Sequence, residues 1–188
     1  MLGHVMSEKG VLPEPTRTKF IEEYPTPQNV KQLRSFLGLM SYYKRFVPNF
    51  SHIASPLHKL LKKDTAYEWT AEHEQAFETL KGNLISPPVL KYPDYSQRFK
   101  LSTDASWQGL GAGLSQGEIG KDRPVAFASR KLNRAEKYYI TTEKEFIAIV
   151  WDVRYFRQYV YGTTFTVVTD YKLLNWIMNL KNPRICFM

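Results

Sequence analysis

The hydrophobic pattern changes its period near Tyr92-Pro93-Asp94, and this change divides the chain into two differently built parts. Residues 25–88 place apolar side chains at helical spacing, whereas residues beyond 97 alternate over short runs that are typical of strands. With 188 residues, 43% of them hydrophobic, the chain is long enough for one sizeable domain or two small ones. We therefore expect a helical unit followed by a mixed unit of strands and helices.

The first 48 residues contain two recognisable patterns. Gly10 separates two short apolar pairs and predicts a small hairpin. A helix is then expected with Thr26 as its cap and Pro27 in its first turn, ending at Pro48. Its predicted inward residues are Val30, Leu33, Phe36, Leu37, Met40 and Tyr43.

Two further helices are expected before the change of period. The first covers residues 53–61 with Ser51 as a candidate cap, and the second covers residues 71–84 with Thr70 as its cap. Pro87-Pro88 stops the second of these helices.

The second part has the order of strands and helices that is typical of an α/β sheet. Its last strand is expected to pair parallel beside its first, because a long helix separates them. The predicted elements are strands at 99–103, 109–115 and 125–129, a helix at 142–159, a strand at 165–169 and a helix at 173–180. The inward stripe of the long helix is predicted to be Phe146, Ile149, Val150 and Val153. The expected fold class is α+β or α/β.

The chain is basic, with 26 Lys and Arg against 18 Asp and Glu and a formal net charge of +8. This favours an anionic partner, nucleic acid before a membrane surface, although basic helices also serve simply as solvated surfaces. Cys186 is the one cysteine, so neither a disulfide framework nor a thiolate zinc site is available within the chain. No signal peptide or apolar run of transmembrane length is present, so we expect an intracellular protein of the cytoplasm or nucleus.

Two aspartates occupy matching places. Asp104 and Asp170 each follow a strand that ends in threonine, and parallel neighbours bring such strand ends to one edge of a sheet. Close carboxylates repel each other unless a divalent cation joins them, and oxygen ligands favour Mg²⁺, Mn²⁺ or Ca²⁺. Glu143 or Glu145 of the intervening helix could supply a third ligand, and periodicity does not choose between them. The alternative is two turn aspartates and a glutamate that complements the helix dipole.

Other chemistries have weaker support. All four histidines precede residue 97, so a Ser-His-Asp triad would have to cross between the two parts. The glycine-rich run GLGAGLSQ lacks the Lys-Ser/Thr ending of a phosphate loop and the helix that a dinucleotide fingerprint requires.

Eight blocks of sequence resemble the pol polyprotein of gypsy-type LTR retrotransposons, from the end of the reverse-transcriptase palm into RNase H. They cover nearly the whole chain in the family's order: LGHVMSEKG, TPQNVKQLRSFLGLMSYYKRFVPNFSHIASPLHKLL, YEWTAEHEQAFETLK, PVLKYPD, LSTDAS, PVAFASRKL, YYITTEKEFIAIVW and FTVVTDYKLLNW.

The resemblance implies a role for each part. Residues 1–24 correspond to the end of the palm with a hairpin like the primer grip, 25–92 to a thumb-like helical subdomain, and 97–188 to an RNase H-like domain. The implied partner is an RNA–DNA hybrid or template–primer duplex. Its implied contacts are Leu2, Gly3, His4, Lys31, Arg34, Lys44 and Arg45. The implied ligands of Mg²⁺ or Mn²⁺ are Asp104, Glu145 and Asp170.

Compared with the family, the chain is expected to be truncated at both ends. It lacks the palm's paired aspartates, so by itself it is not expected to polymerise DNA, and it stops before the family's fourth RNase H carboxylate. The parent activities are RNA-directed DNA synthesis and metal-dependent cleavage of RNA in hybrids. The alternatives are a catalytically silent nucleic-acid-binding module and a decayed or exapted remnant.

Overall fold

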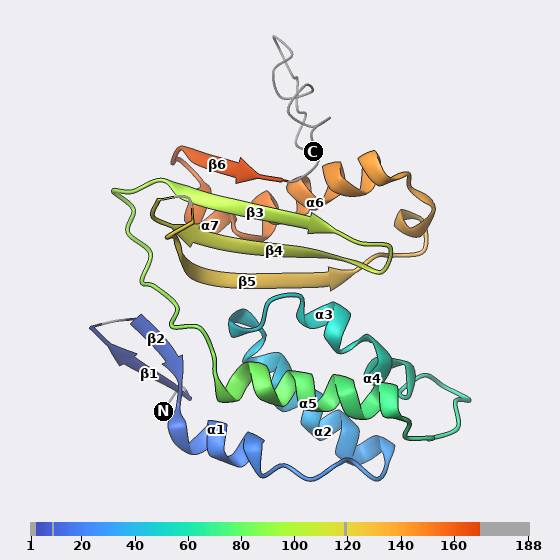
Figure 1. Cartoon of the computed structure of the whole chain (residues 1–188). Coiled ribbons are helices and arrows are strands. Elements are labelled where there is room, and N and C mark those ends of the chain that lie inside the picture. The colour runs from blue at the N-terminus through green and yellow to red at the C-terminus, as the bar shows by residue number, and fades with distance from the viewer. Residues whose placement is uncertain (1–2, 9, 119, 170–188) are drawn as a thin grey trace.

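The computed structural model describes residues 3–8, 10–118 and 120–169, which form a helical unit below a four-stranded sheet with its own helices (Figure 1). The elements of the lower part are β1 (His4–Ser7), β2 (Gly10–Pro13), α1 (Pro15–Glu22), α2 (Val30–Tyr42), η1 (Lys44–Phe46), α3 (Phe50–Ile53), α4 (Ser55–Lys59) and α5 (Ala71–Ile85). Those of the upper part are β3 (Phe99–Ala105), β4 (Gly109–Gln116), β5 (Arg123–Lys131), η2 (Glu136–Tyr138), α6 (Thr141–Tyr155), α7 (Arg157–Val160) and β6 (Phe165–Val168). The expected α+β class is confirmed. The predicted helix at 173–180 lies outside the described residues.

The helical unit has a core of its own, formed mainly by α2 and α5. The predicted stripe of α2 is confirmed except at Val30, which is half-buried. Leu33, Phe36 and Met40 are fully buried, and Phe36 packs against Phe77 of α5. The predicted cap is wrong. Asn29 accepts the Gln32 N–H at 3.0 Å, and Thr26 lies in the loop before the helix.

Other boundaries in this unit also differ from expectation. The helix predicted at 53–61 is two short helices, and Ser51 lies inside α3 and does not cap it. Helix α1 was not predicted, because Ile21 is its only buried residue and the sequence shows no apolar stripe there. Helix α5 agrees with the prediction: Thr70 precedes it, and the Thr70 N–H donates to His73 Nδ1 at 3.1 Å.

The predicted hairpin is confirmed as β1 and β2, paired antiparallel with Ser7 opposite Gly10. Val11 and Leu90 exchange backbone hydrogen bonds at 2.8 and 3.0 Å, which ties the hairpin to the segment after α5. A β-carbon at Gly10 would meet the Leu90 carbonyl oxygen at 2.2 Å, so this close backbone approach requires glycine.

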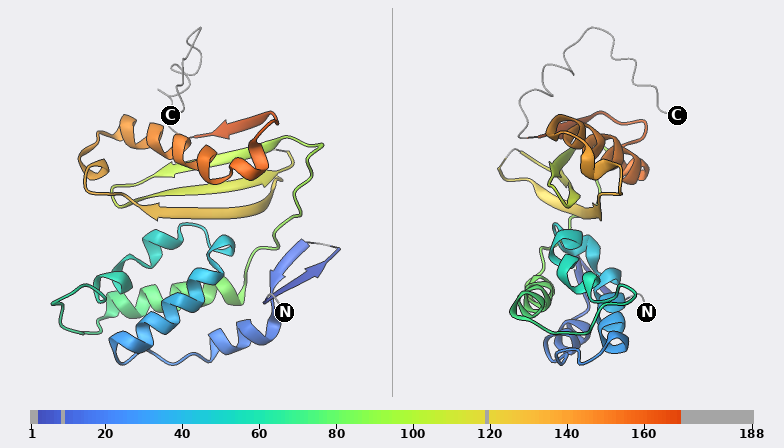
Figure 2. Two further views of the ribbon diagram at one scale, coloured as in Figure 1. Left: turned by 180° about the vertical axis from the view of Figure 1, so that it is seen from behind. Right: turned by 90° about the vertical axis from the view of Figure 1, so that its right-hand side faces the viewer.

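The upper sheet has the strand order β5-β4-β3-β6. β3 pairs antiparallel with β4 and parallel with β6, with Leu101 opposite Val167 and Ser102 opposite Val168. The predicted parallel pairing of the last strand beside the first is therefore confirmed. Helices α6 and α7 lie across one face of this sheet (Figure 2).

The two faces of the sheet have different partners. Leu101, Leu114 and Ala128 are buried with Phe156 under the helices. On the opposite face, Phe127 of β5 packs against the core of the helical unit. The glycines of β4 lie on this second face, where they leave the sheet surface low enough for the helical unit to approach.

The predicted inward stripe of α6 is only partly right. Ile149 is buried, but Phe146 is 40% exposed, and the buried face also contains two acids, Glu145 and Asp152. The helix ends at Tyr155 and is followed by the separate short helix α7. Within residues 3–8, 10–118 and 120–169, no helix combines the length and apolarity that a membrane crossing needs.

Candidate active site

Asp104 lies inside β3, one residue before its end, and not after the strand as the sequence suggested. It is exposed and stands opposite Gly111 of β4, which in turn stands opposite Ser129 of β5. These three residues therefore form a row across the sheet, on the face turned toward the helical unit.

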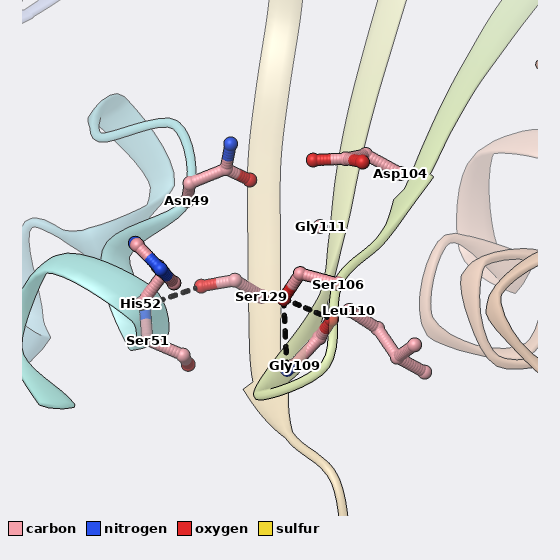
Figure 3. Close-up of a pocket in the computed structure, with 9 residues that line it drawn as sticks. All are labelled: Asn49, Ser51, His52, Asp104, Ser106, Gly109, Leu110, Gly111 and Ser129. Atoms are coloured by element: carbon pink, nitrogen blue, oxygen red, sulfur yellow. Dashed lines mark hydrogen bonds between the residues drawn. The ribbon is translucent and has the colours of Figure 1, made fainter. Parts of the chain in front are cut away.

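A pocket of about 230 Å³ opens beside this row, between the sheet and α3 (Figure 3). Asn49 forms its other wall and has a left-handed backbone with φ of 51°, which asparagine tolerates better than most residues. The Ser51 N–H donates to Ser129 Oγ at 2.8 Å and ties the helical unit to the sheet beside the pocket. Asp104 thus lies at the junction of the two units.

The turn between β3 and β4 is held by Ser106. Its Oγ accepts the Gly109 N–H at 3.1 Å and the Gln108 N–H at 3.3 Å. A backbone hydrogen bond from the Ser106 N–H to the Gly109 carbonyl, at 2.9 Å, closes the same turn. Asp104 is consequently attached to a rigid strand end.

The structure distinguishes the two glutamates that periodicity could not separate. Glu143 is exposed, and its Oε2 accepts the Ile140 N–H at 3.0 Å, so it completes the N-terminus of α6. Glu145 is only 5% exposed and lies on the face of α6 that packs toward the sheet.

Asp104 and Glu145 lie on opposite sides of the sheet, although β3 and α6 pack together. Glu145 is on the helix that covers one face, whereas the Asp104 side chain lies on the other face. Ala105, the residue after Asp104, packs against the small buried cluster that includes Ala148 of α6, so Asp104 points the other way. In the part of the chain that the structure describes, no three His, Cys, Asp or Glu side chains gather in a group that could hold a metal ion. Asp170 lies outside the described residues, and β6 ends at Val168, two positions before it.

Another acid of the upper unit, Asp152, is deeply buried. Asp152 of α6 is 0% exposed, and neither of its carboxylate oxygens has a hydrogen-bond partner among the described residues. Burial raises the pKa of the Asp152 carboxyl to about 8, against the opposing charge of Arg130. The guanidinium of Arg130 instead pairs with Glu136, at 2.6 and 3.0 Å.

The residues expected to resemble a primer grip lie at the start of the hairpin. Leu2 is outside the described residues. The Gly3 carbonyl accepts the Tyr43 hydroxyl at 3.1 Å, and the His4 ring packs within 5.3 to 5.6 Å of the rings of Tyr42, Tyr43 and Phe46. The hairpin is therefore fixed to the end of α2.

The four predicted basic contacts lie along α2 and the turn after it. Lys31 and Arg34 are exposed on α2, and Lys44 is exposed in η1. Arg45 is half-buried, with its guanidinium 5.8 Å from the centre of the Phe46 ring. None of these four cations lines the pocket at Asp104.

Sequence reasoning missed the residues that line the pocket together with Asp104. Asn49 and Ser129 belong to segments far from Asp104 in the chain, and neither carries a motif of its own. The left-handed backbone at Asn49 could not have been foreseen from hydrophobic periodicity.

Comparison with known proteins agrees with this architecture. The family model described as "RNase H-like domain found in reverse transcriptase" matches residues 69–167. The Retrovirus-related Pol polyprotein from transposon 412 of Drosophila melanogaster is 42% identical over 182 residues, which is 97% of this chain and 15% of that protein. This chain therefore spans about a seventh of that relative's length.

Two solved structures share the fold. The foamy viral protease-reverse transcriptase dRH, in complex with ds DNA, aligns with a TM-score of 0.80 and 23% identity over 97% of this chain and 32% of that one. The foamy viral enzyme in complex with RNA/DNA hybrid aligns with a TM-score of 0.77 and 23% identity, covering 98% and 28%. The predicted resemblance to retrotransposon pol polyproteins is confirmed, and the chain belongs to the family of RNase H-like domains found in reverse transcriptases.

Proposed function

We propose that this chain is part of a retroelement pol polyprotein whose activities are RNA-directed DNA synthesis and metal-dependent cleavage of RNA in RNA–DNA hybrids. Its own share is to hold a hybrid or template–primer duplex and to cut the RNA strand. The proposed units are residues 1–24, 25–92 and 97–188, in the order palm end, thumb and RNase H-like domain. The proposed location is the cytoplasm or nucleus.

One observation carries the cleavage proposal. The exposed carboxylate of Asp104 lies near the end of the central strand β3, and β6 runs parallel beside that strand and ends two positions before Asp170. Carboxylate oxygens are the ligands that Mg²⁺ and Mn²⁺ prefer. The residues that would hold the cation are Asp104, Glu145 and Asp170, and the described residues supply two of these three acids.

When bound, the cation would activate water and neutralise charge on the cleaved phosphate. The chain's own residues have separate tasks. Asp104 presents its oxygens next to the turn that Ser106 closes, and the Asn49 side chain occupies the space over Gly111, in the pocket wall that faces the carboxylate. Lys31, Arg34, Lys44 and Arg45 would contact the nucleic-acid backbone, which makes binding sequence-independent and salt-sensitive.

A second candidate function is a silent module that binds nucleic acid without cutting it. It is favoured by the positions of Asp104 and Glu145 on opposite sides of the sheet, because shared coordination would require one of them to reorient.

The experiment incubates the purified chain with a labelled RNA–DNA hybrid in Mg²⁺ or Mn²⁺, while fluorescence anisotropy measures binding of the same hybrid. We expect RNA cleavage that is lost in Asp104→Asn and retained in Asp64→Asn, the same chemical change at an exposed turn. Asparagine suits residue 64 because its φ is 62°. Hybrid binding without cleavage would support the silent module, and the absence of both would contradict the proposed function.

A further inference from the structure

A second pocket, of about 470 Å³, is lined by residues of both units near α4 and the turn between β3 and β4. These two segments lie at the end of the molecule away from the β1–β2 hairpin (Figure 1). Trp107 and Gln108, from the turn between β3 and β4, form part of its wall. Five lysines line it: Lys59 and Lys62 at and after α4, Lys131 at the end of β5, Lys137 in η2 and Lys144 in α6. Because two of these lysines come from the helical unit and three from the upper unit, the full concentration of charge arises only when the two units meet.

Most of this positive charge is not neutralised by the protein. Lys59 has a partner, Glu72, whose Oε1 lies 3.8 Å away, and both side chains are largely exposed. Among the described residues, Lys62, Lys131, Lys137 and Lys144 form no ion pair. Partial desolvation lowers the pKa of Lys131, and the charges of Lys62, Lys59 and Lys137 lower it further. Bringing in an anion with several charges would relieve this repulsion.

An exposed aromatic ring stands at the rim of the pocket. Trp107 is 73% exposed at the tip of the turn, even though burial of its large apolar surface would be favourable. The turn that presents it is rigid, because Ser106 closes it and the Leu132 N–H donates to the Gln108 carbonyl at 3.0 Å. A fixed, exposed indole beside lysines can stack on a base whose phosphates the lysines contact.

The stacking surface favours a single strand over a duplex. In a duplex both faces of each internal base are already covered by its neighbours, so an indole gains little from contact with the backbone. An unpaired base offers a free face, and the same binding mode combines base stacking with a positively charged groove. We propose that the pocket of five lysines binds the phosphodiester backbone of a single-stranded nucleic-acid segment, with Trp107 stacked on one of its bases.

This inference rests on the proposed function only in taking nucleic acid as the ligand, and it uses none of the residues proposed for cleavage or hybrid binding. The test measures anisotropy of a short labelled oligothymidylate bound by the full chain over a range of salt concentrations. The pocket variant is Lys62→Gln with Lys137→Gln. The matched control is Lys19→Gln with Lys121→Gln, which removes the same charge from exposed sites elsewhere.

We expect the slope of log affinity against log salt to fall by about 1.4 in the pocket variant, from about 0.7 per lost phosphate contact, and to stay unchanged in the control. Trp107→Ala is expected to weaken binding of oligothymidylate by about tenfold, and to leave binding of an abasic strand of equal length unchanged. Circular dichroism on each variant establishes that it is folded.

Equal slopes for the pocket variant and its control would overturn the lysine site. Equal effects of Trp107→Ala on the two strands would overturn the stacking contact. A wild-type chain that binds and cuts hybrid but ignores the single strand would refute this inference and leave the proposed function standing. If the chain neither binds nor cuts hybrid but binds the single strand through this pocket, the inference stands and the proposed function is refuted.

Discussion

The side chain of Asn49 lies directly over the backbone of Gly111, so that a β-carbon built on this glycine would come within 2.2 Å of Asn49 Oδ1. This contact joins the start of α3 to the middle of β4, and it forms the wall of the pocket that faces Asp104. The glycine and the asparagine therefore set how closely the helical unit approaches the sheet.

Gly111→Ala should destabilise the chain, because the new methyl group and the Asn49 amide cannot occupy the same space. In an Asn49→Gly background the same substitution should instead stabilise it by about 0.5–1 kcal/mol, since alanine restricts the unfolded strand more than glycine does. Urea denaturation of the four proteins in a double-mutant cycle measures this reversal of sign. Free energies of unfolding that add within about 0.5 kcal/mol would show that the two residues are not coupled.

Gly10→Ala should cost more than Gly111→Ala. Its φ of 135° is strained for any other residue, and the atom in the way is the backbone oxygen of Leu90, which cannot rotate aside as a side chain can. We expect a loss of about 1–3 kcal/mol in the free energy of unfolding. Gly38→Ala is the matched control, because nothing lies within 4 Å of its added carbon and helix α2 should gain about 1 kcal/mol. Similar changes in both variants would contradict the close approach at Leu90.

Asp152 should make the chain less stable as the pH rises. The folded-state pKa of about 8 lies above the ordinary value of 3.8, so between these two pH values the folded state binds more protons than the unfolded state. The free energy of unfolding therefore falls with increasing pH, by at most about 1.4 kcal/mol per unit, from about pH 4 to about pH 8.

Asp152→Asn keeps the shape of the side chain and removes this proton. Thermal unfolding across the same pH range should show the variant gaining stability relative to the parent chain as the pH rises. Asp64→Asn, at an exposed turn, serves as the control and should follow the parent. A difference between parent and Asp152→Asn that does not change with pH would show that this carboxyl is ionised in the folded chain.

Local patterns predicted those elements whose stability depends on one clear apolar stripe or a single cap. Helix α5 follows Thr70 as expected, and β3 and β6 pair in parallel because a long helix connects them. The predicted inward stripe of α6 was partly wrong because Glu145 and Asp152 are buried, whereas acidic residues are normally expected on the exposed face of a helix. Their burial depends on the sheet beneath the helix, which no local window contains.

The surroundings of the candidate site depend on contacts between distant segments. The sequence marks Asp104 by its place after a predicted strand, but Asn49 and Ser129 reach it only because the helical unit packs on the sheet. The five-lysine pocket was missed for the same reason. The sequence shows that the chain is basic, but it does not show which lysines lie close together. The five lysines gather around one pocket only in the folded chain.

The two glutamates of α6 should respond differently to the same substitution. Glu143→Gln should keep RNA cleavage near the parent level, because glutamine can still accept the Ile140 N–H and complete the helix N-terminus. Glu145→Gln should reduce cleavage by several orders of magnitude, because an amide is a much poorer ligand for Mg²⁺ than a carboxylate. The measurement is the single-turnover rate on a labelled hybrid, with hybrid affinity determined in parallel. If Glu143→Gln abolishes cleavage and Glu145→Gln preserves it at equal affinity, the helix glutamate of the proposed site is Glu143, and the buried position of Glu145 serves packing alone.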